Sequence, residues 1–139
     1  VTIDGTGVGE DALRAACELV REIPGGTLTG VHVVSQETSA SRGGRSKADE
    51  LLDAAAQKVR TYGINFKPIT IQGKDIGRTV CKAAKDCNAD LLVIASQDRR
   101  PLVARGLVDL DKLLGGSVSD YIRVHAPAPV LLVREPERN

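Results

Sequence analysis

Apolar residues recur along this chain in two alternating spacings, which predict helices and strands in regular succession. Every third or fourth residue is apolar within 10–23, 46–62 and 73–87, and this spacing places the apolar side chains on one face of a helix. Short runs rich in β-branched or aliphatic residues separate these segments, as expected of buried strands. The predicted strands are 27–34, 64–71, 91–95 and 130–133.

Glycine, proline and serine mark where these elements end. Val1–Asp4 looks like the tail of a further strand, whose first residues we expect to precede Val1. Residues 35–45 hold serines, glycines and arginines without a period, so we expect a loop there and a helix that begins at Ser46. Pro68 cannot donate a ladder hydrogen bond, which places its strand at an edge of the sheet.

This order of elements predicts an α/β fold. We expect one domain over residues 1–139, built as an open five-stranded parallel sheet with helices on both faces, of the Rossmann-like type. Ligands of such sheets bind outside the carboxyl ends of the strands, where the winding direction reverses. Four places meet this rule and are expected to converge on one crevice. They follow Ile3, Val33, Ala95 and the glycine turn at Gly116.

Composition narrows the class of protein. Apolar residues make up 42% of the chain and charged residues 27%, as in soluble globular domains. The net charge of +1 favours neither nucleic acid nor an anionic membrane, and no apolar run approaches the ~18 residues of a membrane helix. The odd number of cysteines, with no CxxC pair, argues against a disulfide framework or a zinc site. We expect His32 and His125 to have structural roles. We expect a cytoplasmic protein without metal ligands of its own.

The segment 106–133 carries the strongest candidate chemistry. Gly116 and Ser117 open a predicted helix that ends before Pro127. The free N–H groups of a helix's first turn attract anions, and glycine lets a phosphate approach the backbone closely. Ser117 with Asp120 three residues later also fits a capping box, so the same residues could form only a turn and a cap. Both interpretations stay open from these residues alone.

Several segments resemble the universal stress protein family. They are TIDG at 2–5, VHVV at 31–34, NADLLVIAS at 88–96 and GGSVSDYIRVHAPAPVLLV at 115–133. The resemblance covers nearly the whole chain and implies a stress-response or regulatory protein that binds ATP or a related adenine nucleotide, with Mg²⁺. It also implies a homodimer formed through Val130–Val133. Slow ATP hydrolysis stays open, but the sequence contains no GxSxG, HExxH or GxxxxGK[ST] motif, and we assign no catalytic residue.

The resemblance also assigns roles to individual residues. Asp4 would contact the ribose, although from its position alone it could merely cap the first helix, and the backbone of Val33 would face adenine. The phosphates would be held by Gly106, Gly116 and Ser117, and Val118 is also expected among the nucleotide-binding residues.

The chain departs from the family pattern after the fourth strand. Ala95 and Ser96 stand where the family has its first glycine, and we still place both among the nucleotide-binding residues. Residues 97–105 then form an insert that contains Arg99, Arg100 and Arg105. Their guanidinium groups suit the bidentate geometry of phosphate, but loop charges often face solvent. Because some family members bind no nucleotide, the alternative is a nucleotide-free dimeric interaction module of the same fold.

Overall fold

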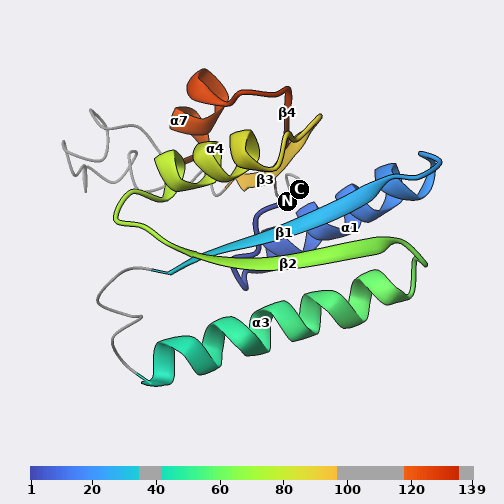
Figure 1. Ribbon diagram of the computed structural model, residues 1–139, viewed down its shortest axis with the longest axis horizontal. Helices are drawn as coiled ribbons and strands as arrows, with labels where there is room; N and C mark the ends of the chain where they lie inside the picture. Colours follow the sequence, from blue (N-terminus) through green and yellow to red (C-terminus); the bar gives the residue numbers. More distant parts are fainter. Residues whose placement is uncertain (35–41, 97–117, 135–139) are drawn as a thin grey trace, which may run out of the picture.

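A computed structural model describes residues 1–34, 42–96 and 118–134. Helices and strands alternate along the chain (Figure 1): α1 (Gly7–Arg21), β1 (Thr27–Val34), α3 (Arg42–Arg60), β2 (Asn65–Gln72), α4 (Ile76–Asp86), β3 (Leu92–Ser96), α7 (Val118–His125) and β4 (Val130–Arg134). None of the helices in these ranges is both long enough and apolar enough to cross a membrane. The alternation confirms the predicted α/β class.

The sheet consists of two parallel strand pairs, β1 with β2 and β3 with β4, joined through the first residues of the chain. The amide of Ile3 donates to the carbonyl of Val31 over 2.8 Å, and the amide of Thr2 donates to the carbonyl of Val93 over 3.2 Å. Residues 1–3 therefore lie between β1 and β3. Thr2 makes only an isolated bridge to Val31, so the described ranges contain four named strands rather than the predicted five.

Helices cover both faces of the sheet, as predicted. One core cluster joins α1 and α3 to the strands through Leu13, Cys17, Val59, Leu28 and Val93. A second cluster joins α4 and α7 to the opposite face through Val80, Ile94 and Ile122. Figure 1 shows α4 and α7 together on one side of β1 and β2, with α3 on the other side. The carboxyl ends of the strands are thus flanked by helix ends from both layers.

Pro68 lies in β2, which pairs with β1 alone among the described strands and so forms an edge of the sheet. The predicted edge position is confirmed. It follows from the missing N–H of proline, which leaves one side of its strand without a donor.

Two predicted helix starts are wrong. Helix α1 begins at Gly7 rather than Glu10, because Thr6 caps it: the Thr6 hydroxyl oxygen accepts a hydrogen bond from the amide of Gly9 over 3.0 Å. Helix α3 begins at Arg42, inside the predicted loop. Each residue added to an existing helix gains a backbone hydrogen bond, which offsets the ~1 kcal/mol that glycine costs there. The rest of the predicted loop, 35–41, lies outside the described residues.

Candidate functional site

A crevice of about 400 Å³ opens at the carboxyl end of the segment 1–3 and of β3. Its polar lining comes from Thr2, Asp4 and Thr6 near the start of the chain and from Ser119 in α7. Its apolar lining comprises Ile76, Ile94, Ala95, Val118 and Ile122. A volume of this order suits a small organic ligand, and aliphatic walls with a few polar groups are typical of such sites.

Asp4 is held at the turn between the first strand segment and α1. Gly5 takes a φ of 79°, which lets the chain turn into the helix immediately after Asp4. One carboxylate oxygen of Asp4, Oδ1, accepts hydrogen bonds from the backbone amide of Thr6 over 2.9 Å and from the hydroxyl of Thr6 over 2.7 Å. The side chain of Asp4 is exposed, so this carboxylate presents a fixed negative charge at the mouth of the crevice.

Gly9 allows the carboxylate to lie this close to α1. Gly9 is buried in the first turn of the helix, and a Cβ added there would overlap Oδ1 of Asp4. Any larger residue at this position would have to displace the carboxylate. The position of Asp4 therefore depends on a glycine that the helix itself does not require.

The apolar side of the crevice is formed where α4 meets α7. Asp75 caps α4 by accepting from the amide of Arg78 over 3.2 Å, which starts the helix at Ile76. Next to it, a Cβ on Gly77 would lie 2.8 Å from the ring of Tyr121 in α7, so the two helices approach closely here. Ile76 remains 48% exposed and Val118 44% exposed. These half-exposed aliphatic side chains are available to cover an apolar ligand face.

Three of the predicted nucleotide-binding residues, Asp4, Ala95 and Val118, line the crevice. Ser96 follows Ala95 at the end of β3 and is buried. Val33 lies near the carboxyl end of β1 and packs against the cluster of α4 and α7, and it is not among the described residues that line the crevice. The structure thus brings together Asp4, Ala95 and Val118 and places Val33 outside the crevice lining.

The remaining predicted site residues lie outside the described ranges, and their contacts with phosphate stay predictions. They are Gly106, Gly116, Ser117, Arg99, Arg100 and Arg105.

Sequence reasoning missed Thr6 and Ile76. A threonine directly before the first helix, with a glycine three residues later, is a capping pattern that could have drawn attention to Thr6. Ile76 is the first residue of α4, and no pattern in the sequence around it marks it as a site residue.

His32 ties β1 to the segment that ends in Asp4. Its Nδ1 lies 2.7 Å from the carbonyl oxygen of Ile3, and because a carbonyl only accepts, Nδ1 carries the proton. His125 contacts the ring of Tyr121, with 4.3 Å between ring centroids. Each histidine thus has a contact within the fold, and a purely structural role for both stays a prediction.

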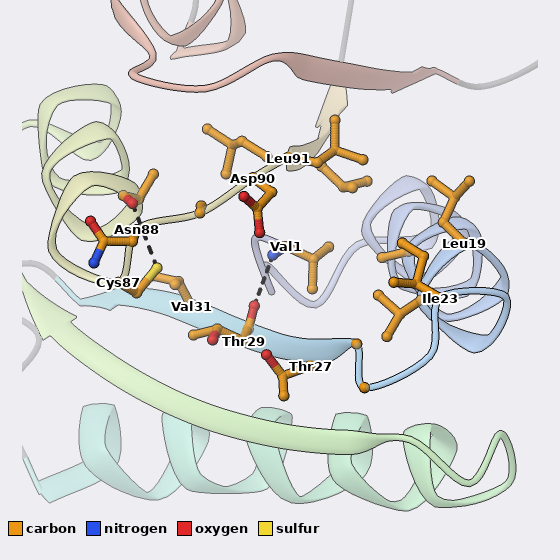
Figure 2. A pocket seen from close by; sticks show the side chains of 18 of the residues that line it. Val1, Leu19, Ile23, Thr27, Thr29, Val31, Cys87, Asn88, Asp90 and Leu91 are labelled. Carbon is orange, nitrogen blue, oxygen red and sulfur yellow. Dashed lines mark hydrogen bonds between the residues drawn. The ribbon is translucent and has the colours of Figure 1, made fainter.

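A second hollow, of about 330 Å³, lies at the amino ends of β1 and β3 (Figure 2). Figure 2 shows the α-amino group of Val1 donating to the carbonyl of Thr29, over 2.8 Å. In a chain that starts at Val1, burial lowers the pKa of this α-amino group to about 6. Ligands of open parallel sheets bind at the carboxyl ends of strands, so we assign the candidate site to the crevice beside Asp4 instead.

Comparison with protein families gives a match to the universal stress protein family over residues 1–134. A comparison with curated proteins gives no match.

Solved structures of universal stress proteins share the fold. One in complex with cAMP is 19% identical, with a TM-score of 0.74 over 96% of this chain and 93% of that chain. One from Archaeoglobus fulgidus in complex with dAMP is 21% identical, with a TM-score of 0.73 over 95% of this chain and 93% of that chain. One from Arabidopsis thaliana with AMP bound is 18% identical, with a TM-score of 0.70 over 98% of this chain and 90% of that chain. At these identities the structures establish the fold, and since the family match spans nearly the whole sequence, the chain belongs to the universal stress protein family.

Proposed function

We propose that this chain binds ATP or a related adenine nucleotide in the crevice at the carboxyl ends of the strands. The observation that carries this proposal is the fixed carboxylate of Asp4 at the mouth of a crevice that also has an aliphatic wall. A nucleoside has the matching chemistry, since its flat base has apolar faces and its ribose carries hydroxyl donors. Universal stress proteins solved with cAMP, AMP and dAMP support this choice of ligand.

In this arrangement the ribose hydroxyls donate to Asp4. A carboxylate only accepts hydrogen bonds, and Oδ1 already accepts two of them from Thr6. Within the described part of the chain, Oδ2 has no hydrogen-bond partner and is the oxygen left for a ribose hydroxyl. The adenine would then lie against the aliphatic side chains of Ile76 and Val118.

The phosphates would extend toward the first turn of α7, which begins at Val118. Amide N–H groups at a helix start have no partners within the helix and lie at the positive end of its dipole. Gly106, Gly116 and Ser117 would complete this cradle, with the three arginines of the insert as further phosphate contacts. Mg²⁺ would accompany ATP by binding its phosphates, and any hydrolysis would be slow. We place such a protein in the cytoplasm, in a stress-response or regulatory role.

The test is direct measurement of bound and added nucleotide. Protein purified without added nucleotide is denatured, and the released fraction is examined for adenine by absorbance and mass. Thermal unfolding with ATP, AMP and cAMP follows, because a ligand at ~100 times its Kd stabilises the folded state by ~2.7 kcal/mol. Asp4→Ala should reduce the thermal shift, whereas Asp53→Ala, which removes an exposed carboxylate from α3, should leave it unchanged. No released adenine and no shift with any of the three nucleotides would refute the proposal.

A second candidate, a dimeric interaction module, is favoured by the other edge of the sheet. β4 pairs with β3 alone among the described strands, and it carries Leu132, which is 42% exposed. Val124 on the preceding helix is 69% exposed. An exposed apolar edge strand tends to pair with a strand of another chain, so we propose a homodimer formed through β4. This dimer is compatible with nucleotide binding and would be the whole function if no nucleotide binds.

Light scattering after size-exclusion chromatography measures this association. Leu132→Lys should convert a dimer into a monomer, because a charged side chain on an edge strand opposes pairing. Ile23→Lys places the same charge on an exposed apolar position at the amino ends of the strands and should leave the dimer intact. A wild-type chain that is monomeric at high concentration would rule out the second candidate.

A further inference from the structure

The hydrogen bonds between Asp4, Thr6 and Gly9 form a small network at the mouth of the crevice. We propose that Thr6 is a positioning residue, which orients the carboxylate of Asp4 and thereby makes the site prefer ribose over 2′-deoxyribose. This inference rests on the proposed nucleotide-binding function and deepens it.

Thr6 holds Asp4 with two donors. The backbone amide and the side-chain hydroxyl of Thr6 both donate to Oδ1, over 2.9 Å and 2.7 Å. Two bonds from different directions to one oxygen fix the plane of the carboxylate as well as its distance. The other oxygen, Oδ2, is therefore held in one orientation at the residue that lines the crevice.

The hydroxyl of Thr6 is itself fixed. Its oxygen accepts from the amide of Gly9 over 3.0 Å, and an amide N–H can only donate. The single hydroxyl proton is consequently directed to Asp4. Thr6 is half-buried and lines the crevice, so this network lies at the site itself.

A fixed carboxylate discriminates between sugars better than a mobile one. If the ligand lacks the 2′-hydroxyl, a carboxylate that can rotate turns toward the remaining hydroxyl or toward water. A carboxylate held by Thr6 keeps its orientation, and the oxygen that faced the 2′-hydroxyl loses its partner. Hydrogen bonds to charged groups are strong enough that this loss should weaken binding by about tenfold or more.

Thr6 also caps α1, and substitutions can separate the two roles. Thr6→Ser keeps the donor to Asp4 and the acceptor for Gly9. Thr6→Asp keeps an acceptor for the helix cap, but an ionised carboxylate cannot donate to Asp4. Thr6→Val removes both interactions. The added charge of Thr6→Asp repels the phosphates of AMP and dAMP equally, so it cancels in the ratio of their affinities.

Isothermal titration calorimetry with AMP and dAMP tests the inference on wild type, the three Thr6 variants and Asp4→Ala. We expect wild type and Thr6→Ser to prefer AMP by about tenfold or more. Thr6→Val, Thr6→Asp and Asp4→Ala should show a ratio near one, with far-UV circular dichroism confirming that each variant is folded. If Thr6→Val does not fold, Thr6→Asp and Thr6→Ser carry the comparison.

Three results would overturn the inference, and they differ in whether they also refute the proposed nucleotide site. A wild-type ratio near one, or a wild-type ratio retained by Thr6→Asp, refutes positioning by Thr6 but leaves the nucleotide site in place. A wild-type chain that binds neither AMP nor dAMP refutes the proposed function, and the role of Thr6 falls with it.

Discussion

Replacing Gly9 with alanine separates helix propensity from the contact with Asp4. Alanine is favoured over glycine inside a helix by up to ~1 kcal/mol, and Gly7 and Gly9 both lie in the first turn of α1. A Cβ on Gly7 has nothing within 4 Å, whereas a Cβ on Gly9 overlaps Oδ1 of Asp4 and lies 3.1 Å from the hydroxyl oxygen of Thr6. We therefore expect Gly7→Ala to stabilise the protein and Gly9→Ala to lose that benefit.

The magnitude follows from the bonds that would be lost. Asp4 is exposed, so its carboxylate can turn away from a new methyl group without distorting α1. The cost is then the loss of two hydrogen bonds from Thr6, each with a net contribution of ~0.5–1.5 kcal/mol. The propensity gain is similar in both variants and cancels between them. Gly9→Ala should thus be less stable than Gly7→Ala by about 1–3 kcal/mol.

Urea unfolding followed by far-UV circular dichroism measures the difference, since the chain has no tryptophan to report by fluorescence. The same pair of variants is then compared in an Asp4→Ala background. There the penalty at Gly9 should disappear, because the oxygen that the new Cβ would overlap is gone. Equal stability of Gly9→Ala and Gly7→Ala in the wild-type background would show that the carboxylate is not held against α1. That result would also remove the geometric basis for the role of Thr6.

Three further predictions concern the rest of the fold. Iodoacetamide should alkylate exposed Cys87 before buried Cys17, whose thiol pKa is raised by desolvation, and peptide mass spectrometry showing equal rates would contradict this. In a chain that starts at Val1, the free energy of unfolding should rise by about 2 kcal/mol from pH 6 to pH 8. Burial lowers the pKa of the α-amino group from 8.0 to about 6, so the unfolded state binds more protons in that window. Adding two residues before Val1 replaces the amine with an amide and should abolish this rise in urea titrations. Gly30→Ala places a Cβ 2.6 Å from the ring of Phe66 and should destabilise the protein by about 1–3 kcal/mol, a cost that should shrink in a Phe66→Leu background.

Local sequence determined most of the elements but not all of their ends. β1 occupies the predicted range 27–34, because its β-branched residues are bounded by a Pro-Gly-Gly turn. Pro68 indicated an edge strand because its missing N–H has a direct consequence for pairing. The first turn of α3 was not predictable, since 42–45 contains two glycines and becomes helical only as the extension of a helix already formed. Single-residue propensities do not contain that cooperative effect.

The candidate site was predictable where it depends on strand ends. Asp4 and Ala95 follow apolar runs, and the carboxyl-end rule placed both near a ligand. Ile76 was not predictable in the same way, because its place at the crevice depends on how closely α4 approaches α7. That approach is set by Gly77 against Tyr121, a contact between residues far apart in the sequence. No local pattern around Ile76 contains it.

The central place of residues 1–3 in the sheet has a consequence for biosynthesis. This segment is translated before both strands with which it pairs. Its first partner, β1, follows soon after it, but its second partner, β3, is available only after Val93 has been made. Pairings between residues so distant in sequence form slowly, and incomplete sheets expose apolar surface. Until β3 leaves the ribosome, Val1 and Ile3 lack the part of their packing that Val93 supplies in the finished protein. Ribosome-associated chaperones that shield short apolar segments should therefore act on this protein during the synthesis of its first three βα units.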